Sequence, residues 1–184
     1  MKKIISLFAR NYDGDKLVWD EVVPGAEWVL AGEGRPSLKW DGTCCLVRGG
    51  VLYKRYDAKA GKKPPPDFEA AQEPDPVTGH WPGWVPVGDG PDDKWHRSAT
   101  IPTRDGTYEL LGPKVQGNPE NFPTHLLMPH GDAADFEAYG NPRTFADIRS
   151  FFGAHDMEGI VWRHDDGRMV KIKAKDFGIA RGPK

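Results

Sequence analysis

The chain has 184 residues, the length of one ordinary domain, so we expect a single domain spanning residues 1–184. Its 25 Lys and Arg residues against 27 Asp and Glu residues give a net charge of −2, so a nucleic-acid partner would need a local basic patch. Hydrophobic residues make up 38% of the chain, and no stretch approaches the roughly 20 apolar residues of a membrane span, which excludes a membrane protein.

The N-terminal part of the chain is typical of strands joined by turns. Residues 4–8 form an apolar run that stops at Arg10, too soon for the core of a signal peptide, and we interpret it as a first strand. Residues 16–30 contain further apolar runs separated by Pro24-Gly25. This pattern predicts strands joined by a turn.

The two cysteines, Cys44 and Cys45, are adjacent in the sequence. They cannot form a normal disulfide framework and lack the spacing of zinc ligands, which fits a reducing compartment. We therefore expect a cytoplasmic protein in which both cysteines are small buried residues of a strand.

Lys39 stands two residues before Asp41 and Gly42 in the segment SLKWDGTCC. A lysine amine attacks phosphorus or carbonyl centres only when it is unprotonated, and lysine loses its proton most readily when it is desolvated or placed beside other cations. Lys39 is therefore a candidate covalent nucleophile. The alternative is a simple turn, because lysine, aspartate and glycine are also ordinary turn residues.

A hairpin and a basic stretch follow. Residues 43–47 and 51–57 are rich in β-forming residues and flank Gly49-Gly50, which predicts a hairpin. The basic residues of this part of the chain are Arg48, Lys54, Arg55, Lys59, Lys62 and Lys63. They form either a phosphate-binding edge or a solvated hairpin, and Arg55, central in its strand, is expected to face inward.

Residues 64–106 show little periodicity but contain Trp81, Trp84 and Trp95. A disordered segment would not retain three tryptophans, so we expect an ordered loop with a strand. The tryptophans are either core and loop anchors or stacking platforms for bases. The six histidines of the chain show no metal-ligand spacing such as HxxxH.

Glu109 is the one acid in the stretch at residues 108–119, which begins with an apolar run. A buried carboxylate costs several kcal/mol unless it is paired or hydrogen-bonded. Ribose hydroxyls of a nucleotide would satisfy it, and so would a salt bridge to a structural arginine. Both interpretations stay open at this point.

The clearest helix of the chain is predicted over residues 144–152, after a short apolar strand at 125–128. Thr144 is placed to cap its N-terminus, and Gly153 is expected to end it. Its apolar stripe consists of Phe145, Ile148 and Phe152, and we interpret this stripe as core.

The last informative stretch is a hairpin predicted by Asp166-Gly167 between two alternating runs. The period of two places Lys171 and Lys173 on one face of its second strand. Two lysines on one face of an internal strand repel each other unless an anion lies near them. An exposed edge strand is the alternative.

With these residues in place, the chain resembles the covalent nucleotidyltransferase superfamily of ATP-dependent ligases and capping enzymes. The matching segments, in chain order, are KWDG at 39–42, YEL at 108–110, EGIV at 158–161 and VKIK at 170–173. Within that superfamily, KxDGTCC, HWPGWVPV, ELxGPKVxGNPE and HxLxPHG are similar to motifs of the small RNA ligase family of vertebrates and microbes.

This resemblance implies an ATP-dependent RNA ligase, active in RNA repair, that joins RNA 5′-phosphate and 3′-hydroxyl ends in three nucleotidyl transfers. Lys39 would carry AMP, Lys171 and Lys173 would act on the α-phosphate and depress the pKa of Lys39, and Glu158 would help bind Mg²⁺ or Mn²⁺. The implied nucleotide-binding residues are Lys39, Asp41, Gly42, Arg55, Glu109, Lys171 and Lys173. The implied RNA-binding residues are Lys54, Lys59, Lys62 and Lys63.

The sequence departs from the wider superfamily at three points. Cys44 stands where many DNA ligases have an arginine. The aromatic residue that usually stacks on the base is not obvious in this sequence, and Phe122 and Met128 are the candidates for that role. The sequence ends at Lys184, so we expect no C-terminal OB domain of the kind that many relatives have.

The fold implied is α+β, with two packed antiparallel sheets that hold the nucleotide between them and flanking helices outside. Two other functions remain possible from the sequence. One is a different covalent nucleotidyltransferase, of the capping type, and the other is a non-catalytic module that binds RNA ends.

Overall fold

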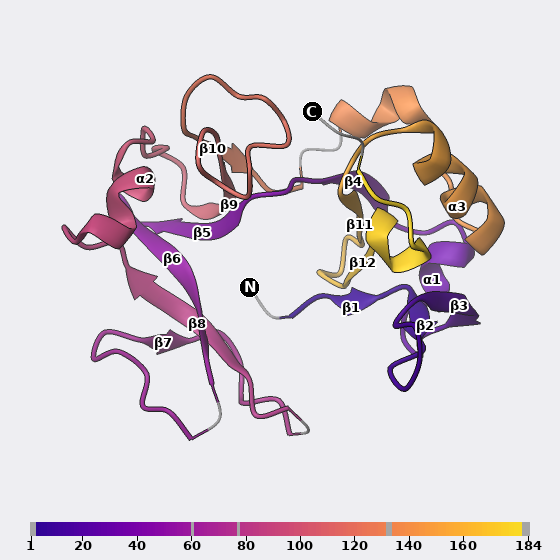
Figure 1. Ribbon diagram of the computed structural model, residues 1–184, viewed down its shortest axis with the longest axis horizontal. Coiled ribbons are helices and arrows are strands. Elements are labelled where there is room, and N and C mark those ends of the chain that lie inside the picture. The colour runs from indigo at the N-terminus through magenta and orange to yellow at the C-terminus, as the bar shows by residue number, and fades with distance from the viewer. Residues whose placement is uncertain (1–2, 60, 77, 132–133, 182–184) are drawn as a thin grey trace. The chain divides into compact units, whose positions relative to one another are not determined.

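The computed structural model describes residues 3–59, 61–76, 78–131 and 134–181 (Figure 1). The chain divides into two compact units. One unit contains Lys3 and Asp41–His130, and the other contains Ile4–Trp40 and the described residues from Gly131 onward. The chain therefore crosses from one unit to the other between Trp40 and Asp41, inside the KWDG segment, and returns after His130.

The unit that contains Asp41–His130 is built on an antiparallel sheet. Among the described residues, six strands lie in the order β10-β9-β5-β6-β8-β7. Their bounds are β5 Thr43–Arg48, β6 Val51–Ala58, β7 Glu69–Ala70, β8 Trp81–Pro86, β9 Gly106–Leu111 and β10 Leu126–Pro129. Two short helical segments, η1 (Pro91–Asp93) and α2 (Lys94–Arg97), follow β8.

The predicted hairpin at Gly49-Gly50 is confirmed. The two glycines connect β5 to β6 with φ values of +57° and +75°, the left-handed region that two-residue hairpin turns require and that glycine adopts without strain. One face of the sheet buries a hydrophobic cluster that includes Cys45, Val47 and Leu110. The strand expected among the tryptophans is also present, as β8.

The other unit contains a sheet with the strand order β1-β12-β11-β4 within the part of the chain that the structure describes. Its strands are β1 Ile5–Ser6, β4 Arg35–Lys39, β11 Gly159–Arg163 and β12 Met169–Lys173, and a separate ribbon pairs β2 Phe8–Arg10 with β3 Val18–Val22. The helical segments are α1 Glu27–Leu30, η2 Ala134–Tyr139, α3 Phe145–Ala154 and η3 Ala174–Phe177.

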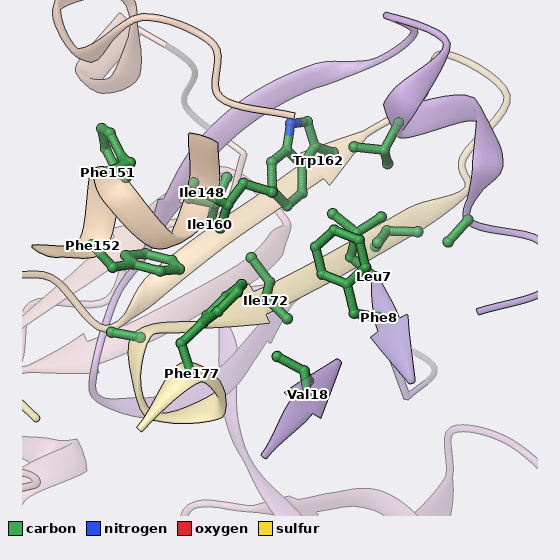
Figure 2. Packing of buried hydrophobic residues seen from close by; sticks show 14 of the residues in the cluster. Leu7, Phe8, Val18, Ile148, Phe151, Phe152, Ile160, Trp162, Ile172 and Phe177 are labelled. Carbon is green, nitrogen blue, oxygen red and sulfur yellow. The ribbon is translucent and has the colours of Figure 1, made fainter. Parts of the chain in front are cut away.

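Helix α3 covers one face of this sheet, as its apolar stripe predicts. Figure 2 shows Ile148 and Phe152 of α3 packed toward Ile160 and Ile172, which β11 and β12 contribute to the same cluster. Thr144 accepts a hydrogen bond from the backbone N–H of Asp147 and so caps the helix, as expected.

The closing hairpin forms as predicted, with β11 and β12 paired antiparallel around the turn at Asp166-Gly167. Strand β12 lies between β1 and β11, so the alternative of an exposed edge strand is wrong. Val170 and Ile172 are fully buried. Lys171 and Lys173 therefore share the opposite face.

Two local predictions are wrong. Residues 27–30 form the helix α1 and not a strand, because an apolar run as short as Trp28–Leu30 does not distinguish the two periods. Helix α3 continues through Gly153 to Ala154 and ends where His155 adopts an extended backbone. An added Cβ at Gly153 would meet nothing within 4 Å, so this glycine does not interrupt the helix.

The predicted α+β class is confirmed, with sheets that are antiparallel apart from the parallel pair of β1 with β12. The packing of the two sheets against each other and the single domain over 1–184 stay predictions. None of the helices in the described parts of the chain has the length and apolar content needed to span a membrane.

Candidate functional site

Three strands bring the predicted nucleophile and the two closing lysines to one face of a sheet. Lys39 is the last residue of β4, and Lys173 is the last residue of β12. Gly159, at the start of β11, pairs with both of them in register. Residues directly opposite each other in a sheet point to the same face, so Lys39 and Lys173 lie on either side of a position without a side chain.

Gly159 is required by the close approach of its neighbours. A Cβ at this position would overlap the carbonyl oxygen of Ile172 on β12. The adjacent Glu158 supplies the negative charge between the lysines. Its Oε2 lies 2.5 Å from Lys39 Nζ and its Oε1 lies 2.5 Å from Lys173 Nζ. The motifs matched in the sequence contain Lys39, Glu158 and Lys173, and the structure brings these three residues together.

The cluster of Lys39, Glu158, Lys171 and Lys173 is partly removed from water. The side chains of Lys39 and Lys173 are about one-fifth exposed, and that of Glu158 is 11% exposed. Burial alone would raise the pKa of Glu158, but Lys39 and Lys173 hold it below its ordinary value. Glu158 is therefore a carboxylate at neutral pH.

Lys171 is the most perturbed lysine of this cluster. Burial, together with the positive charges of Lys173 and Lys39, lowers its pKa from 10.5 to about 8. A lysine with this environment favours an anion above it, because an added negative charge would offset both the desolvation and the repulsion. The arrangement is therefore a preformed anion site on a sheet face.

The sequence did not indicate the residues that support this cluster. Asp176 is buried in η3, where it accepts a hydrogen bond from the backbone N–H of Lys173 and pairs with Arg10. Ser37 donates to the carbonyl oxygen of Val161, two residue pairs away from Lys39. An acid three residues after the KxK motif is a possible signal for Asp176, since it opens a short helical turn.

The second group of predicted residues lies in the other unit. Glu109 of β9 pairs in register with Cys44 of β5 on one side and with Met128 of β10 on the other. Glu109 is buried, and its Oε2 lies 2.8 Å from Nε2 of His130. The partner that the structure shows is a histidine, and not the arginine that the sequence left open as an alternative. Binding of ribose by Glu109 stays a prediction.

Gly42 is explained by its neighbours in the same unit. A Cβ at this position would overlap the carbonyl oxygen of Leu110 and crowd the side chain of Glu109. Gly42 is thus needed for the chain to enter the sheet beside Glu109. Asp41 is the first residue of this unit, directly after the crossing from Lys39 and Trp40.

The basic stretch divides into paired and exposed residues. Arg48 forms an ion pair with Glu69, and Lys54 lies on the buried face of its sheet, where it pairs with Asp93. Lys59, Lys62 and Lys63 are exposed. The Arg55 side chain is one-fifth exposed and lies over the ring of Trp84, 5.3 Å from its centroid.

The aromatic residues mostly have structural roles. Trp84 is buried beneath Arg55, the indole N–H of Trp81 donates to the carbonyl oxygen of Gln72, and Trp95 stacks on His125. These contacts favour the interpretation as core and loop anchors. Of the two base-stacking candidates, Met128 shares a sheet face with Glu109, whereas Asn118 holds the backbone of Phe122 through two hydrogen bonds.

Comparison with known proteins gives consistent matches. A family model described as RNA ligase 1 matches residues 100–183. The RNA ligase 1 of Pongo abelii is 27% identical and the match covers 78% of this chain and 67% of the relative. The RNA ligase 1 of Danio rerio is 32% identical over 55% of this chain and 42% of the relative. That of Mus musculus is 26% identical over 77% of this chain and 66% of the relative.

These matches support an RNA ligase family relationship for this chain. The matched region spans between 42% and 67% of the length of these relatives.

Proposed function

We propose that this relative of RNA ligase 1 is an ATP-dependent RNA ligase that joins a 5′-phosphate to a 3′-hydroxyl through AMP bound to Lys39. The observation that carries the proposal is the group of Lys39, Glu158, Lys171 and Lys173 on one sheet face, where three amines surround one carboxylate. A phosphate group is the anion that such a face would accept.

The proposed reaction has three transfers. The unprotonated amine of Lys39 attacks the α-phosphorus of ATP, so that a P–N bond forms and the bond to pyrophosphate breaks. A 5′-phosphate oxygen of RNA then attacks the same phosphorus, and the P–N bond breaks. Finally a 3′-hydroxyl attacks the 5′-phosphorus, a phosphodiester forms and AMP leaves.

Lys171 and Lys173 would stabilise the negative charge that develops on the phosphoryl oxygens. Their positions on a β-strand are fixed before ATP binds, and preorganised charges of this kind are often the largest single contribution to catalysis. The half-buried surroundings strengthen the effect, because water screens these charges less than it screens those at an open surface.

Glu158 fits the proposed Mg²⁺, since a carboxylate oxygen is the donor that this hard cation prefers. Both of its oxygens form ion pairs with lysines, so a bound cation would take one oxygen from a lysine. The cation would supply neutralisation of phosphate charge. In this chain a cation on Oε2 of Glu158 would also release the amine of Lys39 from its counterion.

In the other unit we assign Glu109 and Arg55 to the nucleotide, and Lys59, Lys62 and Lys63 to RNA phosphates. Glu109 is a buried carboxylate that could accept hydrogen bonds from ribose hydroxyls, and the three lysines are exposed. Lys54 is less suited to RNA binding than the sequence indicated, because its amine is paired with Asp93.

The test is covalent labelling of the purified chain with Mg²⁺ and α-labelled ATP or GTP. Intact mass should rise by one AMP with ATP, and the label should be absent in Lys39→Ala. Lys175→Ala is the matched control, because Lys175 is an exposed lysine two residues after Lys173.

The outcomes separate the alternatives. Labelling by GTP instead of ATP would favour an enzyme of the capping type. A chain that binds RNA ends without any covalent label would favour the non-catalytic module. A label that persists in Lys39→Ala would overturn the assignment of the nucleophile.

A further inference from the structure

Three residues of different chemistry meet in the unit that contains Asp41–His130. Cys44 on β5, Glu109 on β9 and His130, directly after β10, each offer one ligand atom, and these atoms all lie within 4.8 Å of one another. Strand register fixes the first two, since Cys44 and Glu109 are directly opposite. A backbone hydrogen bond from His130 to the carbonyl oxygen of Thr107 holds the third.

Glu109 is buried, and Cys44 and His130 are partly buried. Glu109 is 8% exposed, and its hydrogen bond with His130 is 2.8 Å long. The other ring nitrogen of His130, Nδ1, is buried without a hydrogen-bond partner among the described residues. Nε2, which faces Glu109, is therefore the ring nitrogen offered to an ion beside the carboxylate.

We propose that Cys44, Glu109 and His130 form a binding site for a transition-metal cation, with Zn²⁺ as the best match. A thiolate and a carboxylate together carry two negative charges, which balance the charge of the ion. Thiolate, imidazole and carboxylate are the three side-chain ligands that zinc takes in proteins.

The distances suit a tetrahedral site after a small adjustment. Two atoms bound to one Zn²⁺ at about 2.0–2.1 Å lie about 3.3 Å apart at the tetrahedral angle. The 2.8 Å separation of Glu109 and His130 would widen slightly, and Cys44 would move toward the ion. Three protein ligands leave a fourth position open to water or to a ligand.

The choice of metal follows from the donor atoms. Sulfur and imidazole nitrogen favour zinc and related ions, whereas Mg²⁺ prefers oxygen ligands and retains several waters. The site is therefore distinct in kind from the carboxylate of Glu158. It also goes beyond the proposed ligase reaction, which requires no ion at this position, and its test needs no ATP.

Binding would release protons. The thiol of Cys44 must lose its proton to become a ligand, and His130 must be neutral. Cys45 does not compete for the ion, because its side chain is on the buried face of β5 and burial keeps its thiol protonated by raising its pKa. The two neighbouring cysteines therefore provide a matched pair of thiols.

The experiment adds Zn²⁺ or Co²⁺ alone to the full chain. Co²⁺ should give a sulfur-to-metal charge-transfer band in the near ultraviolet, and Zn²⁺ should remove that band by displacement. Cys44→Ser should abolish the band, and Cys45→Ala should keep it. Affinity for Zn²⁺ should fall by at least about 10-fold in Cys44→Ser and His130→Gln, since even loss of an outer partner of a zinc ligand costs that much.

His80→Gln is the control for the histidine, because His80 is exposed and remote in sequence from the cluster. Circular dichroism of each variant establishes that it is folded. A charge-transfer band that persists in Cys44→Ser, or Zn²⁺ affinity that is equal in wild type, Cys44→Ser and His130→Gln, would indicate an adventitious ion only and would overturn the proposal. So would the absence of any band in the folded wild-type chain.

Discussion

Two glutamates of this protein, Glu158 and Glu109, lie in opposite electrostatic surroundings. Glu158, in the unit that contains the closing hairpin, is flanked by Lys39 and Lys173 at 2.5 Å. Glu109, in the other unit, is paired with His130 and lies opposite Cys44. Glu109 projects from strand β9, whereas Glu158 directly precedes strand β11.

The difference shows that the neighbours of a buried carboxylate decide its chemistry. An excess of amines around Glu158 leaves net positive charge, which favours phosphate and a shared hard cation. A thiol and an imidazole around Glu109 leave the potential for net negative charge, which favours a soft cation or hydrogen-bond donors such as ribose hydroxyls. The predictions below test this difference between Glu158 and Glu109.

The largest effect is expected from removing the carboxylate between the lysines. In Glu158→Ala, the rate of Lys39 adenylylation should fall by about 100-fold or more, the typical cost of losing one preorganised electrostatic group. Single-turnover labelling with ATP and Mg²⁺ measures this rate.

Glu33→Ala is the control, because Glu33 is a half-exposed acid whose partners are His164 and Arg168 in the same unit. The assignment of the closing hairpin to the active site fails if Glu158→Ala keeps near-normal adenylylation while it remains folded.

The second effect concerns stability. Burial and the neighbouring Lys173 and Lys39 lower the pKa of Lys171 from 10.5 to about 8, so the unfolded chain binds the extra proton between about pH 8 and 10.5. Unfolding free energy should therefore rise with pH across this window, and the full cost of Lys171 is present below pH 8. We expect Lys171→Met to be more stable by about 1–3 kcal/mol at pH 7, although it loses adenylylation.

Urea unfolding of the wild type and Lys171→Met, at neutral pH and near pH 10, measures this difference. The gain should shrink at the higher pH, where the wild-type amine is neutral. Lys175→Met, at an exposed position, should show neither effect. Equal stability of the wild type and Lys171→Met at neutral pH would contradict the prediction.

The third effect is competition between Zn²⁺ and ATP for Glu109, measured through the adenylylation of Lys39. If Glu109 binds both Zn²⁺ and ribose, Zn²⁺ should inhibit adenylylation less at high ATP than at low ATP. Each variant is compared with its own metal-free rate, and the Zn²⁺ concentration for half-inhibition should rise by at least about 10-fold in Cys44→Ser. Inhibition that does not depend on ATP concentration would separate the metal site from the nucleotide.

Sequence patterns predicted local features well. Gly49-Gly50 and Asp166-Gly167 marked their hairpins, because turn geometry depends on a few adjacent residues. The alternation of side chains along a strand likewise placed Lys171 and Lys173 on one face, because it too is a local property of the backbone. The short run at 27–30 was misassigned, because so few residues carry no clear period.

The partners of the buried acids were not predictable in this way. His130 and Glu109 are 21 residues apart, and they meet only because the register of β9 with β10 brings that end of β10 beside Glu109. Lys54 illustrates the same limit, since its partner Asp93 lies 39 residues later, in the helical segment η1. Contacts of this kind depend on tertiary packing rather than on local pattern.

The smallest expected effect is a change of salt dependence. Lys59, Lys62 and Lys63 are exposed, and a net charge of −2 gives no general attraction for RNA. Each phosphate neutralised on a single strand contributes about 0.7 to the slope of log affinity against log salt concentration. Replacing the three lysines by glutamine should therefore flatten the slope for RNA binding by up to about 2. Lys39 adenylylation involves only ATP and should scarcely change, so the same variant separates RNA contacts from the nucleotide reaction.

Replacing Lys16, Lys94 and Lys175, which are exposed and are not among the proposed RNA contacts, controls for the loss of three positive charges. An equal flattening in that control would place the RNA elsewhere on the surface and leave the assignment of Lys39 intact.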